Sequence, residues 1–116
     1  MDIRDKNSPE YKCDDGHFVR SKAEMLIDNW LYIHDIVHAY EIRLPLADHL
    51  TTLYCDFYLP KHNVYIEFFG GDWDDIDYRK RCNKKIKQYH DNDLTCIEIF
   101  PDDIKRLSDY LSRYLS

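Results

Sequence analysis

The residues most suited to carry out chemistry are two carboxylates, Asp56 and Glu67, within the stretch Leu53 to Gly70. Two runs rich in Tyr, Phe, Val and Ile flank a Pro-Lys-His-Asn centre, a pattern typical of a β-hairpin. A loop centred on the Lys-His pair places Asp56 directly opposite Glu67, with Cβ atoms roughly 5 Å apart. Such a pair is tolerated in a sheet if it is solvated, shares a proton or holds a cation.

The hairpin register also predicts which side chains share a face. It pairs Leu59 with Val64 and Phe57 with Ile66. One face is expected to be apolar and to consist of Cys55, Phe57, Leu59, Val64, Ile66 and Phe68. The other face is expected to carry Tyr54, Asp56, Tyr58, Tyr65 and Glu67. Its three tyrosines indicate that a helix covers this face in part, so the two acids would need a cation or a shared proton.

Glu24 is a third acid that could join such a site. It lies three residues after Ser21 in the sequence Ser-Lys-Ala-Glu, which is the pattern of a helix capping box. The capping role is complete in itself and is the structural alternative to a chemical role.

Lys85 is the candidate cation. It lies in a basic helical stretch, one turn from Arg81 and one turn from Tyr89. The alternative is a solvated lysine, and helical geometry alone does not separate Lys85 from Lys84 or Lys87.

The remaining residues of chemical interest give weaker signals. No histidine pair has ligand spacing within one element, so surface or partly buried positions are expected for His17, His34, His38, His49, His62 and His90. The scattered cysteines, expected as reduced thiols, are Cys13, Cys55, Cys82 and Cys96. Trp30 is expected in the core, and Trp73 either stacks on a ligand or anchors a loop.

Length and composition indicate a single α/β domain. The chain has 116 residues, enough for one hydrophobic core. Residues 1–10 are polar and without period, which predicts a mobile N-terminal arm followed by one domain over 11–116. No stretch reads as a membrane span or a signal peptide, so we expect a soluble, cytoplasmic protein.

Charge is unevenly distributed along the chain. The net charge of −6 argues against a protein that coats nucleic acid without specificity. Six of the sixteen basic residues nevertheless fall within nine positions: Arg79, Lys80, Arg81, Lys84, Lys85 and Lys87. This local patch is more informative about a partner than the net charge is.

The element order that the pattern predicts is αβββαβα, with a small mixed sheet. Helices are expected over 21–34, over 76–90 with Asp74 or Asp75 as the cap, and from residue 101, where a core-facing stripe would consist of Ile104, Leu107, Leu111 and Tyr114. Strands are expected over 36–43, 53–59, 64–69 and 94–100. Residues 11–20 read as an irregular turn segment, and 44–52 as a connection.

In this order of motifs the chain resembles the PD-(D/E)XK nuclease superfamily, and most of all its small branch related to very short patch repair endonucleases. The superfamily core is an αβββαβ restriction-endonuclease-like unit. The resemblance covers roughly residues 11–111 and rests on RSKAE at 20–24, YCDFYLP at 54–60, VYIEFFG at 64–70, the basic helix from Tyr78 through Lys85 to Tyr89, and the strand at 94–100.

The resemblance implies roles for individual residues. Asp56 matches the metal-binding Asp, Glu67 the second acid, and Glu24 the helix acid that often completes the site. The signature expects a lysine two residues after the second acid, and this chain has Phe69 there. Related branches supply the lysine from the next helix, which makes Lys85 the best substitute.

A metal-dependent endonuclease is the function that this resemblance implies, with Mg²⁺ or Mn²⁺ as cofactor and DNA as the expected nucleic acid. The residues expected to contact backbone phosphates are Arg79, Lys80, Arg81, Lys84 and Lys87. Because the chain holds little beyond the core, a homodimer or a partner subunit could select the target. The alternatives are a catalytically silent module that binds nucleic acid and a protein-interaction domain that uses the acidic surface.

Overall fold

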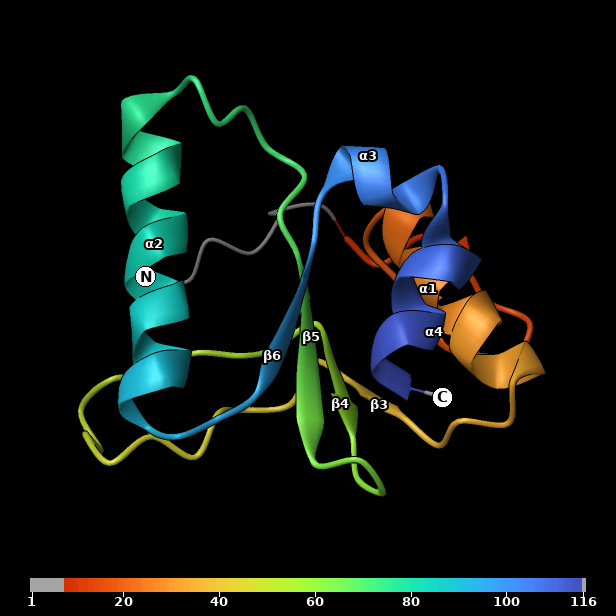
Figure 1. Ribbon diagram of the computed structural model, residues 1–116, viewed down its shortest axis with the longest axis horizontal. Coiled ribbons are helices and arrows are strands. Elements are labelled where there is room, and N and C mark those ends of the chain that lie inside the picture. The colour runs from red at the N-terminus through yellow and green to blue at the C-terminus, as the bar shows by residue number, and fades with distance from the viewer. Residues whose placement is uncertain (1–7, 116) are drawn as a thin grey trace.

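A four-stranded mixed sheet forms the centre of the computed structural model, which describes residues 8–115 (Figure 1). In spatial order its strands are β3 (Ala39–Tyr40), β4 (Phe57–Leu59), β5 (Val64–Phe68) and β6 (Cys96–Ile99). The first three strands are antiparallel, and β6 runs parallel to β5. A parallel connection needs a crossover, which the helix α2 (Ile76–Asp91) provides.

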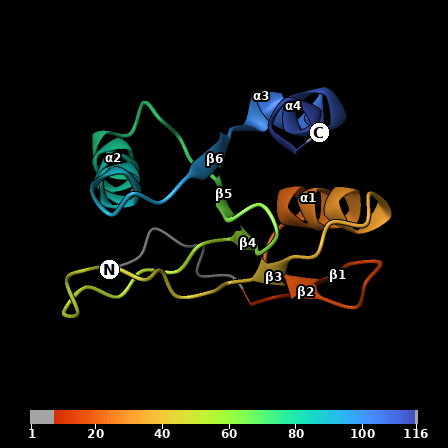
Figure 2. The same cartoon turned by 60° about the horizontal axis from the view of Figure 1, so that its bottom comes forward.

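Helices lie on both sides of this sheet (Figures 1 and 2). On one side are α1 (Lys22–Ile33), the short α3 (Pro101–Ile104) and α4 (Leu107–Leu115). On the other side α2 stands alone. The predicted mixed α/β class is therefore confirmed, and the predicted order αβββαβα holds from α1 onward, with the last helix divided into α3 and α4. Most of the predicted arm, residues 1–7, lies outside the described residues.

The register predicted for the central hairpin is confirmed. β4 and β5 pair Phe57 with Ile66 and Leu59 with Val64. The turn between them contains Asn63 with φ of 51°, a left-handed conformation that Asn tolerates better than most residues. The loop therefore fixes which side chains face each side of the sheet.

The prediction of two uniform hairpin faces fails at one residue. Cys55 was expected beside Phe57, but it is buried in a different apolar cluster, together with Tyr65. The chain bends at Asp56, and the regular strand begins only at Phe57. Alternation does not continue through that bend, so residues before it face the side that α2 covers.

The strand predicted over 36–43 is shorter than expected. β3 covers only Ala39–Tyr40, because Glu41 has a φ of 57°, which regular strand geometry excludes. The Glu41 N–H still donates to the carbonyl of Asp56 at 2.9 Å. An isolated bridge between Arg43 and Tyr54 continues the pairing beyond this kink.

Residues 11–20, predicted as irregular, form a small antiparallel hairpin of β1 (Tyr11–Lys12) and β2 (Phe18–Val19). Strands of two residues give no alternating pattern, so the sequence does not show them. Gly16 allows the turn because it adopts a φ of 97°. The hairpin packs against α1.

Caps define where the helices begin. Ser21 accepts a hydrogen bond from the Glu24 N–H at 3.1 Å, and Asp75 accepts from the N–H groups of Asp77 and Tyr78. The terminal helix is interrupted at residues 105–106 and gives α3 and α4. The core-facing stripe predicted for this helix is confirmed at Leu107 and Leu111, which are buried. The prediction is wrong at Tyr114, because that side chain is exposed.

Two apolar clusters stabilise the layers. The larger one lies between the sheet and α1 and α4, and Trp30 packs against it as predicted. The smaller one lies on the α2 side and consists of Leu44, Leu46, Leu53, Cys55, Tyr65 and Tyr89. All four cysteines are free thiols, as expected. No helix within residues 8–115 has the length and apolar character that crossing a membrane requires.

Candidate functional site

Asp56 and Glu67 are buried together, so the reading of a solvated acid pair is wrong. Asp56 lies at the bend before β4, and Glu67 lies near the end of β5. Their exposed fractions are 6% and 2%. The hairpin register places them opposite each other, and the charge of Asp56 acts on the titration of Glu67. Burying two like charges side by side requires compensation.

Lys85 and Tyr89 supply that compensation from α2. The Lys85 ammonium lies 3.0 Å from Glu67 Oε2 and 3.2 Å from Oε1, and the Tyr89 hydroxyl donates to Oε2 at 2.5 Å. Burial, with the charge of Asp56, raises the pKa of Glu67 to about 8, while Lys85 and Tyr89 act in the opposite direction. Near neutral pH the pair therefore holds either a proton or a cation.

Asp56 is fixed from its own hairpin. Its Oδ2 accepts a hydrogen bond from the backbone N–H of Phe68, on the strand opposite, at 2.7 Å. A backbone donor orients a carboxylate more rigidly than a flexible side chain does. The carboxylate is thus held in place by the same strand pairing that brings Glu67 next to it.

The structure distinguishes Lys85 from its neighbours. Lys85 is only 3% exposed, whereas Lys84 and Lys87 are exposed. Its ammonium also donates to the backbone carbonyl of Tyr54 at 2.6 Å, two residues before Asp56. Of the three lysines considered from the sequence, Lys85 is the one whose ammonium contacts the second acid.

Glu24 lies in the first turn of α1, on the side of the sheet away from α2 (Figure 1). Its Oε1 accepts hydrogen bonds from the Arg20 N–H and from the Tyr40 hydroxyl, both at 3.0 Å. Ser21 caps the helix as predicted, whereas the Glu24 carboxylate accepts from the N–H of Arg20, one residue before the cap. Glu24 is buried, and its hydrogen bond to Tyr40 links the start of α1 to β3.

Phe69 occupies the position where the superfamily signature expects a lysine. Its side chain is buried and lies in an aromatic group with Trp73 and Phe100, with ring centroids 5.4 to 6.1 Å apart. A lysine there would bury its charge among rings. The same contacts favour the role of a loop anchor for Trp73.

The five basic residues expected to contact phosphates all lie on the exposed surface of α2: Arg79, Lys80, Arg81, Lys84 and Lys87. Lys87 is already paired with Asp91 at 2.5 Å, one turn further along the helix. Arg79 contacts the carbonyl of Trp73 at 3.3 Å. Arg81 and Lys84 line a pocket, which makes them the best placed of the five.

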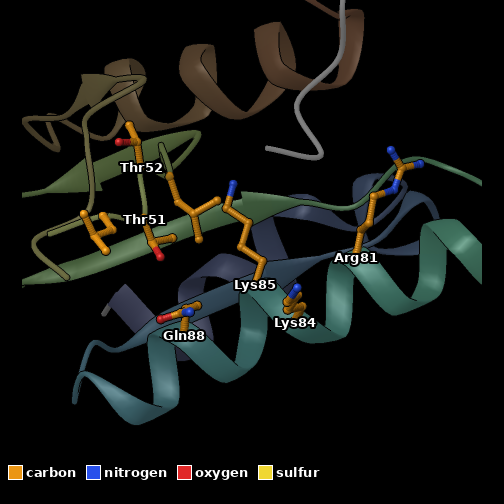
Figure 3. A pocket seen from close by; sticks show the side chains of 8 residues that line it. Thr51, Thr52, Arg81, Lys84, Lys85 and Gln88 are labelled. Atoms are coloured by element: carbon orange, nitrogen blue, oxygen red, sulfur yellow. The ribbon is translucent and has the colours of Figure 1, made fainter. Parts of the chain in front are cut away.

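This pocket has a volume of about 470 Å³ and lies between α2 and the segment 50–53 (Figure 3). Lys85 rises from α2 toward the strands, while Arg81 and Lys84 lie on the same helix at the pocket wall. Thr51, Thr52 and Gln88 complete its polar lining. Lys85 lines this pocket and also contacts Glu67, so it links the basic surface of α2 to the buried acid pair.

Two residues at the acid pair were not predicted as site residues. Tyr89 lies four residues after Lys85 and so faces the same way, which was the available signal. Glu98 pairs with Glu67 in the parallel register of β6 and therefore faces the same side of the sheet. Burial raises the pKa of Glu98. The alternation of the last strand was the only hint of it.

Two of the histidines take part in a second cluster. His17 and His38 are partly buried, as expected, and converge with Asp15 and Asp28 between the N-terminal hairpin and α1. Their ligand-type atoms all lie within 4.8 Å of one another. Spacing within one element could not indicate this cluster, because its residues come from three segments.

Comparison of the chain with models of known protein families, with curated proteins and with solved structures finds no match.

Proposed function

We propose that the protein is a metal-dependent endonuclease that hydrolyses phosphodiester bonds, with DNA as the expected substrate. The observation that carries this proposal is the burial of Asp56 and Glu67 together, with Glu67 paired to Lys85, which lines a basic pocket. Carboxylates can hold the metal that phosphodiester hydrolysis uses, and a lysine can stabilise negative charge on the phosphate.

The finer fold assignment belongs to the same proposal. We propose that α1, β3, β4, β5, α2 and β6 form a restriction-endonuclease-like core. In support, the order αβββαβ agrees with the superfamily unit, and the acids lie on the central hairpin. The resemblance in the motifs and the arrangement of the elements thus agree.

The donor set fits a hard divalent cation. Mg²⁺ binds oxygen ligands and commonly takes one or two protein carboxylates. Asp56 and Glu67 would hold it, with Glu98 beside Glu67 on the same face of the sheet and Glu24, the third acid that the resemblance implies, as a further candidate. The raised pKa of Glu67 reflects a site that burial and a neighbouring acid make costly to ionise without a cation. Bound Mg²⁺ or Mn²⁺ would acidify a water molecule and polarise the phosphate.

The chain's own residues would contribute position and charge. The Lys85 ammonium, buried beside the acids, would stabilise negative charge that develops on the phosphate. Tyr89 orients the Glu67 carboxylate through its hydroxyl hydrogen bond. Arg81 and Lys84, at the pocket wall, would hold the nucleic-acid backbone, a contact that positions the substrate but does not read its sequence.

A catalytically silent nucleic-acid-binding module is the second candidate. The observation that favours it is Phe69 at the signature lysine position, together with the ion pair that engages Lys85. This candidate predicts salt-sensitive binding that Mg²⁺ does not change. The endonuclease predicts cleavage that requires the metal.

The test is cleavage of plasmid and single-stranded DNA with Mg²⁺ or Mn²⁺, comparing the wild-type protein with Glu67→Gln. Gln preserves the shape of the side chain and removes its charge. Glu10→Gln, at an exposed position outside the site, is the matched control. We expect metal-dependent cleavage by the wild type and the control and its loss in Glu67→Gln. Equal cleavage by all three proteins would contradict the site assignment, and binding without cleavage would favour the silent module.

A further inference from the structure

Four potential metal ligands meet at the N-terminal end of the fold, away from the acid pair. Asp15 and His17 come from the turn of the β1–β2 hairpin, Asp28 from α1, and His38 from the segment before β3. One nitrogen or oxygen atom of each lies within 4.8 Å of those of the other three. The shortest separations are 2.9 to 3.1 Å, between the histidine nitrogens and the carboxylate oxygens.

Two of these side chains are already oriented by contacts outside the cluster. Asp15 Oδ1 accepts the His17 backbone N–H at 3.0 Å, which directs Oδ2 toward the other ligands. His38 Nδ1 lies 2.8 Å from the carbonyl oxygen of Ile36. A neutral imidazole in this position keeps its proton on Nδ1 and presents the lone pair of Nε2 to the cluster. This is the arrangement that second-shell carbonyls give to metal-binding histidines.

Buried polar atoms inside the cluster lack partners. Asp28 is 0% exposed, and among the described residues its Oδ1 makes no hydrogen bond. His38 Nε2 is also buried without a hydrogen bond, although it lies 3.0 Å from Asp15 Oδ2 and 3.1 Å from Asp28 Oδ2. These distances are short, but the atoms are not aligned for donation. Unsatisfied buried polar atoms are costly, and a cation among the converging atoms would bind His38 Nε2 and balance the buried charge of Asp28.

We propose that Asp15, His17, Asp28 and His38 form a structural zinc site. Zn²⁺ binds His nitrogen and carboxylate oxygen at about 2.0–2.2 Å with tetrahedral geometry, so ligand atoms lie roughly 3.3 Å apart. The four histidine–carboxylate separations need to expand by only a few tenths of an ångström, and the remaining ligand pairs lie within 4.8 Å. Two carboxylates balance the charge of the ion, and four protein ligands leave no open position for a substrate. Two imidazole donors favour Zn²⁺ over Mg²⁺ or Ca²⁺.

A metal-free ion-pair cluster is the competing explanation. Two protonated histidines would balance the two carboxylates, and His17 Nδ1 does contact Asp28 Oδ2 in hydrogen-bond geometry at 2.9 Å. That explanation leaves Asp28 Oδ1 and His38 Nε2 unsatisfied in the buried part of the cluster. The zinc site accounts for His38 Nε2, whose lone pair would bind the ion.

The site would add a link among three segments that already pack together. The β1–β2 hairpin is too short to be stable alone, and the ion would attach its turn to α1 and to the start of β3. A pocket of about 290 Å³, which includes Asp15, His17 and His38 in its lining, gives the ion access from solvent. The proposal is independent of nuclease activity, because none of the four residues belongs to the acid pair or its lysine.

The experiment is titration of chelator-treated full-length protein with Zn²⁺ alone, followed by calorimetry and thermal unfolding, with Co²⁺ absorption as a probe of tetrahedral geometry. His17→Gln and Asp15→Asn remove ligands at partly exposed positions. His62→Gln, at the exposed turn of the central hairpin, is the matched control. Glu67→Gln reports whether the ion binds at the acid pair instead.

We expect one Zn²⁺ per chain in the wild type, His62→Gln and Glu67→Gln, with an increase in Tm on the order of 10 °C at a hundredfold excess over Kd. His17→Gln and Asp15→Asn should lose at least about a hundredfold in affinity. Folded wild-type protein that binds no Zn²⁺ would overturn the proposal. So would unchanged affinity in His17→Gln, or loss of binding in Glu67→Gln.

Discussion

The two acid clusters of this protein balance their charge in different ways. Beneath α2, Asp56 and Glu67 are buried with Lys85, a cation that the chain itself supplies. Between α1 and the N-terminal hairpin, Asp15 and Asp28 form their ion pairs with the histidines His17 and His38. Lysine is charged across the physiological range, whereas histidine loses its charge near neutral pH.

This difference in charge balance predicts that one cluster serves the chemistry and the other the stability of the protein. In the metal-free protein, Lys85 and a proton on Glu67 compensate the negative charge of the acid pair beneath α2. A metal bound there is therefore expected to serve the reaction. The Asp/His cluster has no permanent cation among its own four residues, so a metal there is expected to matter for folding. Variants of the two clusters should therefore change different measurements.

The largest effect is expected for Asp56→Asn in DNA cleavage. Asn retains an acceptor for the Phe68 N–H but loses the charge that would hold the metal. The rate should fall on the order of 1000-fold, while Zn²⁺ binding remains. Asp93→Asn is the control, because Asp93 is exposed and its φ of 55° suits Asn. Cleavage by Asp56→Asn above about a tenth of the wild-type rate would place the reaction elsewhere.

The pH dependence of stability is the next effect, measured with a chelator present. The pKa of Glu67 is about 8 in the folded protein and 4.5 as its ordinary value. The folded state therefore keeps a proton that the unfolded chain releases, and the resulting stability is complete below pH 4.5 and is lost as the pH rises through 8.

Glu67→Gln cannot titrate at this position. Between pH 5 and 8 the wild type should lose on the order of 3 kcal/mol of unfolding free energy relative to the variant. Urea unfolding at intervals of one pH unit measures this difference. Parallel stability profiles for the two proteins would show that Lys85 alone compensates the pair.

Lys85→Met should lower cleavage about 100-fold, because it removes a buried cation from the position next to the acids. Lys84→Met should reduce cleavage less than about tenfold, through weaker substrate binding. Lys61→Met, at the exposed hairpin turn, should leave it unchanged. Equal losses in the first two variants would move the lysine role away from position 85.

The smallest effect concerns the surface of α2. In the inactive Asp56→Asn background, the double change of Arg81 and Lys84 to Gln should weaken DNA binding about tenfold. It should also reduce the number of counterions released on binding by about two, which is measured as a shallower salt dependence of the affinity. The same change at Lys105 and Arg106, exposed on the other side of the sheet, is the control. Equal weakening by the two pairs would indicate binding by overall charge and not by the pocket wall.

The hairpin register was predictable because it follows from the symmetry of one short loop. Once Leu59 pairs with Val64, the positions of Asp56 and Glu67 opposite each other are determined. The face of Cys55 was not predictable, because the bend at Asp56 and the left-handed Glu41 arise from long-range packing rather than from a local pattern.

The other site residues required information that the sequence does not contain. Lys84, Lys85 and Lys87 lie within one helical turn, and the direction in which α2 docks decides which one is buried. His17 and His38 are twenty-one positions apart, and tertiary packing with α1, which carries Asp28, brings them together. Tertiary arrangement, not local spacing, defines both sets.

The way α2 is attached has a consequence for the motions of the protein. The buried positions of this helix are Cys82, Lys85 and Tyr89, so it docks mainly through polar groups and one ring rather than through a continuous apolar stripe. A helix held in this way opens at a lower free energy than α1, whose Ile27 and Leu31 are fully buried. Amide hydrogen exchange should therefore be faster along residues 76–91 than along 22–33. Local opening of α2 would separate Lys85 from the acids while the sheet stays folded.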